Sequence, residues 1–244
     1  MKIFLSGHEG LLGSGFEKIY GNRYEITGYD IKDGDNLLDY PNLIKKMKGC
    51  EQVVHLAAIP RPVKGKGFEE YFEANDLSTL NVIKAAVATG AKRIIYASST
   101  SIYGVEVGIP FKIPIKEDQP FVSQYIPADR LSCGNEYLAY HGSKVIAEQM
   151  LAWYGLTKKI QTVALRFGPV NVKYLGTSVS IENAAQAIHL VLDSRKEFWY
   201  EAFSIVDELD HIDISKAKRI LGYHPEKPDY SKYLIVSELN EKAV

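Results

Sequence analysis

The sequence predicts an α/β protein built on a doubly wound parallel sheet, and three observations support this prediction. A short apolar run at residues 3–5 leads directly into a glycine-rich turn at residues 7–13. Short apolar runs then alternate with stretches of helical periodicity, as in successive strand–helix–strand units. The run at residues 53–56 is nearly continuously apolar, which is typical of a strand covered by helices on both faces.

Each element is expected from its local pattern: strands where short apolar runs end at small or acidic residues, helices where apolar residues recur every three to four positions. The expected strands are residues 3–5, 25–29, 53–56, 93–97, 161–165 and 202–206. The expected helices are residues 10–20, 43–48, 68–89, 138–154, 181–192 and 214–221. Pro41 indicates the start of the second helix, and Gly90 and Gly222 indicate the ends of the third and the last.

Residues 105–137 interrupt this pattern with prolines and little periodicity. A long irregular segment inside a compact domain is uncommon and often functional. We expect a sheet domain at residues 1–165 that carries this loop, and a small cap at residues 166–244 that adds a returning strand and helix.

Composition and charge exclude several classes of protein. Hydrophobic residues make up 46% of the chain and charged residues 24%, and the net charge is -1, so no global attraction to nucleic acid or to a membrane is expected. No apolar stretch is long enough to span a bilayer, and the run at residues 3–5 is too short for a signal peptide. Cys50 and Cys133 stand alone, which favours reduced thiols in a cytoplasmic protein. The histidines form no metal-ligand spacing, and no metal is expected.

The turn after the first strand has the spacing Gly7-x-x-Gly10-x-x-Gly13. Glycine permits the tight turn and lets backbone approach a pyrophosphate, and the following helix N-terminus offers unpaired N–H groups. Asp30 ends the second strand, where a carboxylate can accept hydrogen bonds from the ribose diol of adenosine and would repel a 2′-phosphate. Together these features predict a dinucleotide site that prefers NAD to NADP.

Tyr140 and Lys144 stand four residues apart on an expected helix, so their side chains share one face. The strand at residues 93–97 runs into a cluster of hydroxyls at residues 98–101. In an open parallel sheet, ligands bind beyond the carboxyl ends of the strands, and both the hydroxyl cluster and the glycine turn belong to that edge. His55 is interpreted as a core histidine, because a lone histidine in a buried strand is seldom a catalyst.

These motifs together resemble the extended short-chain dehydrogenase/reductase family, in its NAD-dependent epimerase/dehydratase branch. The matching elements keep the family's order over most of the chain and are Gly7-x-x-Gly10-x-x-Gly13, Asp30, His55-Leu56-Ala57-Ala58, Asn75, Ser98-Ser99-Thr100-Ser101-Ile102-Tyr103-Gly104, Tyr140-x-x-x-Lys144, Leu165-Arg166-Phe167-Gly168 and Leu221-Gly222-Tyr223-His224-Pro225. The resemblance implies a Rossmann-type sheet, NAD as cofactor and hydride transfer at a secondary alcohol.

The resemblance also implies roles for individual residues. Tyr140 would be the acid/base: a free tyrosine titrates near pH 10, and the Lys144 ammonium and the positive nicotinamide ring would favour its phenolate. Lys144 would also bind the nicotinamide ribose, and Ser99 would polarise the substrate oxygen. The residues implied to contact NAD are Gly7, Gly10, Leu11, Leu12, Gly13, Asp30, Ile31, Asn36, Leu37, Leu56, Ala57, Ala58, Asn75, Ala97, Tyr140, Lys144 and Pro169.

Several positions depart from the family pattern. Thr100 and Ser101 stand where the sugar-nucleotide 4,6-dehydratases carry an acidic pair, which argues against elimination of water. Asn36 replaces the aspartate that usually faces the adenine amino group, although its side-chain oxygen can accept the same bond. Pro169 replaces an asparagine found near the nicotinamide in many members.

The region after Arg166 lacks most of the insertions that build a nucleotide-sugar site in this family, and so resembles the shorter uronate and sugar-phosphate dehydrogenases. We expect the loop at residues 105–137 to fold over the substrate. The candidate substrate residues are Thr100, Ser123, Gln124, Tyr125, Arg130 and Lys173. Arg130 or Lys173 could grip a carboxylate or phosphate, and the alternative that both are solvated surface cations stays open.

Three functions stay open from the sequence. A dehydrogenase of a small sugar acid or sugar phosphate and a 4-epimerase of a sugar nucleotide with retained cofactor use the same tyrosine and lysine. The short cap favours the dehydrogenase, whereas family frequency favours the epimerase. A non-catalytic NAD sensor is disfavoured, because Tyr140 and Lys144 are both present.

The assembly is also predicted from the helices. Residues 75–89 and 138–154 carry alanine-rich apolar faces, which in related proteins pair across a two-fold axis as a four-helix bundle. We therefore expect a homodimer.

Overall fold

The computed structural model describes residues 1–244 except for 105–111, 122–133, 175, 208–210 and 236–244. Four of the candidate substrate residues, Ser123, Gln124, Tyr125 and Arg130, lie outside the described residues, as does Cys133.

The central feature is a six-stranded sheet in which every pair of neighbouring strands is parallel, in the order β2-β1-β3-β4-β5-β7. Its strands are β1 (Lys2–Ser6), β2 (Glu25–Tyr29), β3 (Gln52–His55), β4 (Arg93–Ser99), β5 (Gln161–Phe167) and β7 (Trp199–Ile205). The order reverses between β1 and β3, which is the topological switch where such sheets bind ligands. The predicted fold class is confirmed.

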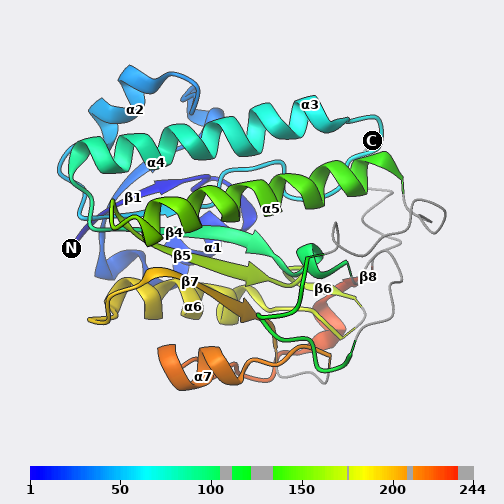
Figure 1. Ribbon diagram of the computed structural model, residues 1–244. Helices are drawn as coiled ribbons and strands as arrows, with labels where there is room; N and C mark the ends of the chain where they lie inside the picture. Colours follow the sequence, from blue (N-terminus) through cyan, green and yellow to red (C-terminus); the bar gives the residue numbers. More distant parts are fainter. Residues whose placement is uncertain (105–111, 122–133, 175, 208–210, 236–244) are drawn as a thin grey trace.

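Helices cover both faces of the sheet (Figure 1). Those on one face are α2 (Tyr40–Met47), α4 (Ser78–Thr89) and α5 (Asn135–Leu156). Those on the other are α1 (Leu11–Tyr20), α6 (Ile181–Asp193) and α7 (Ser215–Leu221). Each layer buries its own apolar core: Leu43, Val82 and Leu151 belong to the first, and Phe16, Ile188 and Leu221 to the second. Since both faces are covered, the four residues of β3 are all buried.

The helix expected at residues 68–89 is interrupted in its middle. It consists of α3 (Phe68–Tyr71), a π-helical segment (Phe72–Leu77) and α4. The hydroxyls of Ser78 and Thr79 donate to backbone carbonyls one turn earlier. Single π turns inside α-helices are frequent at functional sites, and this one carries Asn75.

Other boundaries differ from expectation by a few residues. The strand β4 extends to Ser99, so two of the clustered hydroxyls belong to the strand itself. Helix α5 begins at Asn135, within the end of the expected loop. A second, two-stranded sheet of β6 (Val172–Lys173) and β8 (Leu234–Ile235) was not expected, because two residues carry no readable periodicity.

A buried ion pair joins α5 to the sheet. Arg166 on β5 donates to both carboxylate oxygens of Glu148 on α5, at 3.0 Å from Nε and 2.8 Å from Nη2. Glu148 also accepts from Ser98 on β4 and from Tyr200 on β7, and Arg166 donates to the hydroxyl of Tyr103. The pair therefore connects three neighbouring strands to one helix.

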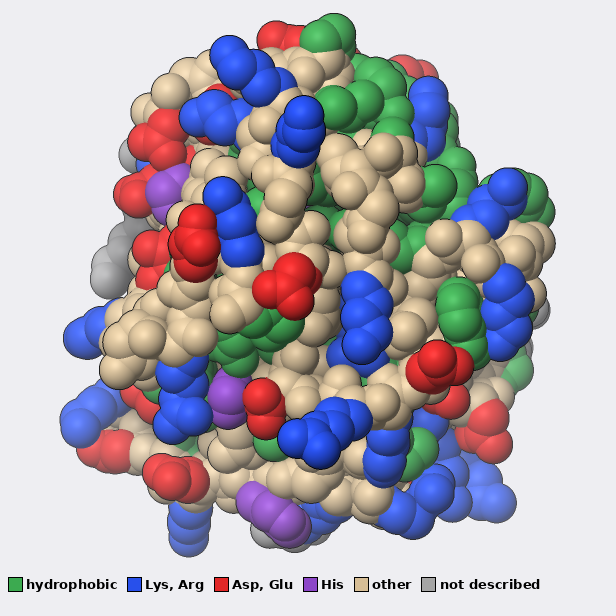
Figure 2. All heavy atoms as spheres, turned by 90° about the vertical axis from the view of Figure 1, so that its left-hand side faces the viewer, with side chains coloured by type: hydrophobic (Ala, Val, Ile, Leu, Met, Phe, Trp, Pro, Cys, Tyr) green, Lys and Arg blue, Asp and Glu red, His purple; other side chains and the backbone are tan. Residues whose placement is uncertain are grey.

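Charges of both signs are mixed over the face where the strands begin (Figure 2). Among the described residues, no helix is both long and apolar enough to cross a membrane.

The Glu148–Arg166 pair gives a stability prediction. We expect Arg166→Met to lower the free energy of unfolding by about 3–5 kcal/mol, because it leaves the Glu148 carboxylate buried and unpaired. Glu25→Gln is the matched control: it breaks the exposed Lys2–Glu25 pair and should change stability by less than about 1 kcal/mol. Urea unfolding followed by circular dichroism checks both, and equal stability of Arg166→Met and wild type would contradict the prediction.

Candidate functional site

The candidate site lies at the carboxyl edge of the sheet, where the segments after β1 to β5 lie close together (Figure 1). The strand register sets Ser6 opposite His55 and Ser99 opposite Phe167, so these strands end near a common level. The sequence-predicted cofactor and catalytic residues, other than Asn75, Tyr140 and Lys144 on helical segments, lie at the ends of these strands or in the segments that follow them.

The glycine turn packs against the segment after β3 too closely for side chains. Gly7 has a φ of +76°, and a Cβ there would lie 2.6 Å from the backbone nitrogen of Ala57. A Cβ on Gly13 would collide with the backbone of Gly7 and His8. Gly10 caps α1 without a side-chain hydrogen bond, so the first backbone N–H groups of the helix remain for an anion. This cradle fits a pyrophosphate.

Asp30 follows β2 beside this cradle and is 8% exposed. Its carboxylate accepts hydrogen bonds from the backbone nitrogens of Glu9 (3.2 Å) and Lys32 (3.0 Å). The carboxylate thus ties the glycine turn to the end of β2. The next residue, Ile31, is 83% exposed, and an exposed apolar side chain at this position could pack against an adenine ring.

His8 belongs to the same corner but was not anticipated from the sequence. Its Nε2 lies 2.6 Å from the Asp33 carboxylate and its Nδ1 3.3 Å from that of Glu17. Partial burial lowers its pKa, but the Asp33 bond and the nearby carboxylates outweigh burial, so the net pKa is raised. The only signal was its position between two glycines of the turn.

Tyr140 and Lys144 occupy one face of α5 and are both nearly buried, at 6% and 3% exposure. The Lys144 ammonium donates to the Ala97 carbonyl at 2.9 Å and to the Tyr96 hydroxyl at 3.2 Å. It also lies 6.0 Å from the centre of the Tyr140 ring. Burial lowers the pKa of Lys144 to about 8, and the charges of Asp76 and Glu148 oppose that fall.

Ser99 is the last residue of β4 and caps the short 3-10 turn Thr100–Tyr103, accepting from the Ser101 nitrogen at 3.1 Å. Thr100 and Ser101 are buried. Because Lys144 binds Ala97, two residues before Ser99, the fold brings this strand end against the Tyr140–Lys144 face of α5.

Asn75 acts as a bridge between two parts of the site. Its Oδ1 accepts from the Ile59 nitrogen at 2.7 Å, and its Nδ2 donates to the Ile59 carbonyl and, at 3.0 Å, to Ser143. Ser143 lies between Tyr140 and Lys144 in the sequence, so Asn75 joins the segment after β3 to the part of α5 that carries these two residues. Contact of Asn75 with a dinucleotide stays a prediction.

Asp76, the next residue, was missed in the sequence reasoning. It is 1% exposed, and neither carboxylate oxygen has a hydrogen-bond partner among the described residues. Burial raises its pKa to about 7, against the opposing charge of Lys144. Its burial could have been predicted from its spacing of three and seven residues from the buried Thr79 and Ile83, because this spacing places the carboxylate on the buried face of the helix.

The remaining cofactor candidates are distributed around the same edge. Leu56, Ala57 and Ala58 follow β3 and are half-buried. The Asn36 side-chain oxygen accepts from the Leu38 nitrogen within its own turn, with Leu37 between them. Leu12 lies in the first turn of α1. Pro169 follows β5, and its carbonyl accepts from Val179. These contacts with NAD also stay predictions.

Lys173, a substrate candidate, is exposed on β6. The described residues contain no group of three or more histidine, cysteine, aspartate or glutamate side chains that could hold a metal.

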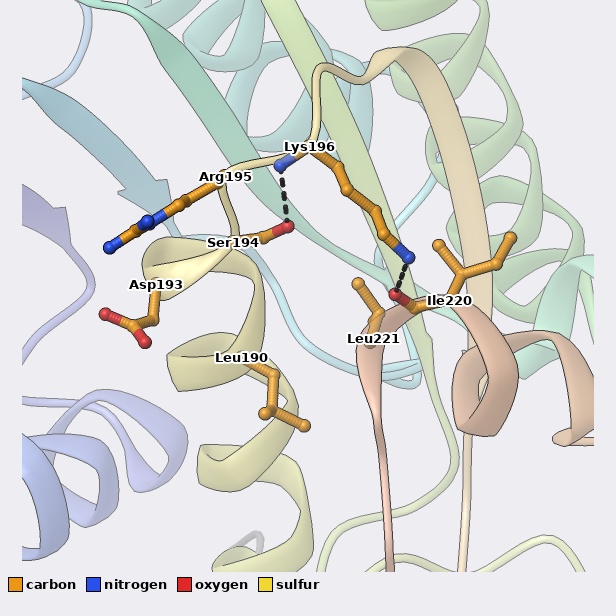
Figure 3. A pocket seen from close by; sticks show the side chains of 7 residues that line it. All are labelled: Leu190, Asp193, Ser194, Arg195, Lys196, Ile220 and Leu221. Atoms are coloured by element: carbon orange, nitrogen blue, oxygen red, sulfur yellow. Dashed lines mark hydrogen bonds between the residues drawn. The ribbon is translucent and has the colours of Figure 1, made fainter.

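A shallow pocket of ≈470 Å³ lies at the opposite edge of the sheet, before the start of β7 (Figure 3). Its lining residues are Leu190, Asp193, Ser194, Arg195, Lys196, Ile220 and Leu221. The Lys196 ammonium donates to the Ile220 carbonyl on one side of the pocket. None of the candidate catalytic residues contributes to it.

The chain is similar to known proteins of one enzyme family. The model of the NAD dependent epimerase/dehydratase family matches residues 3–174. An uncharacterized protein of Methanocaldococcus jannaschii is 29% identical over 209 residues, covering 77% of this chain and 60% of that protein. Uronate dehydrogenase of Pseudomonas syringae pv. tomato is 25% identical over 179 residues, covering 70% and 55%. The chain thus spans about 55–60% of the length of these relatives.

Among solved structures, MoeE5 in complex with UDP-glucuronic acid and NAD has a TM-score of 0.77 at 18% identity, with 100% of both chains covered. At this identity the similarity supports the fold alone. The family match confirms the resemblance inferred from the motifs.

The position of Asp30 generates a prediction about the cofactor. Asp30→Asn should keep the turn but remove the charge. We expect NAD binding to weaken several-fold, since hydrogen bonds to ionised groups are the stronger ones. We also expect the ratio of NAD affinity to NADP affinity to fall by about tenfold, because the carboxylate no longer repels the 2′-phosphate. Calorimetric titration with each dinucleotide measures this. Asp193→Asn, an exposed carboxylate at the opposite edge, is the control, and an unchanged NAD-to-NADP ratio in Asp30→Asn would refute the role.

Proposed function

Because the chain belongs to the NAD dependent epimerase/dehydratase family, a branch of the extended short-chain dehydrogenases/reductases, we propose that it oxidises or reduces a secondary alcohol on a small sugar acid or sugar phosphate. The observation that carries the proposal is the placement of Tyr140 and Lys144. They share the inner face of α5, and Lys144 binds the strand that ends in Ser99. This contact supports a site in which Tyr140, Lys144 and Ser99 act together at the edge that also carries the glycine cradle.

The residues suit proton transfer at an alcohol. In the oxidising direction the Tyr140 phenolate takes the proton of the substrate hydroxyl, and the Ser99 hydroxyl orients the substrate oxygen. The Lys144 ammonium stabilises the phenolate, and its bond to the Ala97 carbonyl fixes its position. NAD supplies the hydride acceptor when bound, held by the glycine cradle and Asp30. The surrounding burial excludes water and strengthens these charge interactions.

The preference for a small substrate rests on the region after β5. Its described part between Gly168 and α6 contains only the two-residue strand β6 and a bridge between Val170 and Val179. We assign residues 1–165 to NAD binding and residues 166–244 to a substrate cap of this limited size. A uronate or sugar phosphate fits such a cap, and Lys173 would supply a cation for its anionic group.

An epimerase of a sugar nucleotide is the second candidate. It is favoured by the similarity to UDP-glucose 4-epimerase of Halalkalibacterium halodurans, which is 28% identical over 152 residues, covering 59% of this chain and 37% of that protein. An NAD sensor without catalysis is the third, and the retained Tyr140 and Lys144 argue against it.

The assay that separates these candidates is NADH formation at 340 nm with NAD and a panel of uronates, aldoses, sugar phosphates and nucleotide sugars. We expect steady turnover with an anionic monosaccharide and a loss of about 10²–10⁴-fold in Tyr140→Phe, the usual range for removal of a general acid/base. Tyr154→Phe, near the other end of α5, is the matched control and should keep activity.

Three other outcomes of this assay would contradict the proposed dehydrogenase or its mechanism. Conversion of a nucleotide sugar to its epimer without net NADH, seen by NMR, would replace the dehydrogenase by the epimerase. Tight NAD binding without turnover of any substrate would favour the sensor. Full activity of Tyr140→Phe would remove the tyrosine from the mechanism.

We further propose that the chain is a homodimer through α4 and α5. Large apolar side chains remain exposed along α3 to α5: Phe68, Phe72, Leu77, Val87, Trp153 and Leu156. Hydrophobic side chains also gather toward the top of Figure 2, on the side where Figure 1 places α4 and α5. Paired across a two-fold axis, these helices would form a four-helix bundle.

Light scattering at micromolar concentration tests the dimer. We expect twice the chain mass of 27.3 kDa for wild type and a monomer for Val87→Glu, which places a charge in the interface. Ile19→Glu is the control, because Ile19 on α1 has the same 38% exposure as Val87 but lies on the other side of the sheet. A monomeric wild type would contradict the proposal.

A further inference from the structure

Asp76 is a buried carboxylate that the proposed chemistry leaves without a role. It is 1% exposed, and both of its oxygens lack hydrogen-bond partners among the described residues. An ionised carboxylate buried without such partners destabilises a fold, so its presence requires a compensating charge or a function.

The π-helical segment explains how this carboxylate reaches the interior. Asn75 and Asp76 are adjacent in sequence, yet each is only 1% exposed, and the segment packs against α5. Asn75 binds Ser143 on α5, and Lys144 is the next residue of that helix, so the packing of the π-helical segment on α5 brings Asp76 to the region of Lys144. The wider turn thus presents two polar residues to the catalytic helix.

Of the two carboxylates that act on the Lys144 ammonium, Asp76 is the one that is not already paired with another cation. The titratable groups that act on this region are Tyr96 on β4, Tyr140 and Glu148 on α5, and His55 on β3. Burial lowers the pKa of His55 to about 3, so the histidine is neutral at physiological pH, and burial raises that of Tyr96 well above 10. Glu148 is already paired with Arg166 at 2.8 Å.

We propose that Asp76 is a positioning residue that acts through Lys144, with its negative charge keeping the buried ammonium protonated while Tyr140 works as a base. The inference rests on the proposed function for the role of Tyr140, but the effect of Asp76 on Lys144 does not depend on any substrate. Asp76 itself touches neither substrate nor cofactor in this proposal.

The first test needs no activity. The titration of Lys144 is followed in the cofactor-free protein labelled with ε-¹³C-lysine, and its signal is assigned by its loss in Lys144→Met. We expect the Lys144 pKa to fall by about one unit or more in Asp76→Asn, as is usual on losing a nearby opposite charge. It should be retained in Asp76→Glu. An unchanged Lys144 titration in Asp76→Asn would overturn the proposal.

The matched control is Glu73→Gln, which removes an exposed carboxylate from the same π-helical segment and should leave the titration unchanged. Asp76→Ser provides a second neutral variant should Asp76→Asn fail to fold. Folding of Asp76→Asn is nevertheless expected. A carboxyl whose pKa is raised in the folded state destabilises that state above its ordinary value near 4. The amide should therefore raise the melting temperature at pH 8, and this gain should vanish below pH 4.

The second test is the pH profile of turnover. The proposal requires a protonated Lys144 for turnover. Asp76→Asn should therefore move the alkaline limb of the pH–rate profile to lower pH, by the same shift that NMR measures for the Lys144 pKa. Its activity should recover at acidic pH. Equal loss at every pH would instead indicate a merely structural role and overturn the proposal. If wild type turns over no substrate while its Lys144 titration still depends on Asp76, the proposed function fails and the Asp76–Lys144 coupling stands.

Discussion

The Glu148–Arg166 ion pair is the interaction on which the arrangement of the site depends. Glu148 lies one helical turn after Lys144 on α5, and its partners come from β4, β5 and β7. Apolar burial is non-directional, whereas hydrogen-bonded charges require a defined geometry. A bidentate pair between buried groups has one geometry, because any other leaves a charge without a partner. The rotation of α5, and with it the direction of Tyr140 and Lys144, is set in this way.

The carboxyl edge combines two kinds of constraint. Around Gly7 and Gly13 the limit is space, since a single added carbon would strike the backbone of the neighbouring segment. Around Asn75 and Lys144 the limit is polarity, since each buried donor has to meet a carbonyl or hydroxyl. The first constraint leaves backbone N–H groups open to a phosphate, and the second holds a cation beside a tyrosine.

The region after β5 is held to the sheet by another buried carboxylate. Asp207 follows β7 and accepts from the Ser180 nitrogen and the Asn183 amide at the start of α6, and from the Tyr233 hydroxyl near the end of the described chain. These bonds join the start of α6 and the end of the described chain to the carboxyl end of β7.

The sequence by itself determined the fold class and the residues that depend on local spacing. The glycines of the turn, Asp30 and the Tyr140–Lys144 pair are readable because a tight turn, a strand end and a helix face each leave a short-range pattern. The π-helical interruption, the Asn75–Ser143 bond across 68 residues and the buried Asp76 were decided only by tertiary structure. Their roles depend on which distant segments pack together: spacing can assign Asp76 to the buried face of its helix, but only the packed neighbours show which groups it meets there.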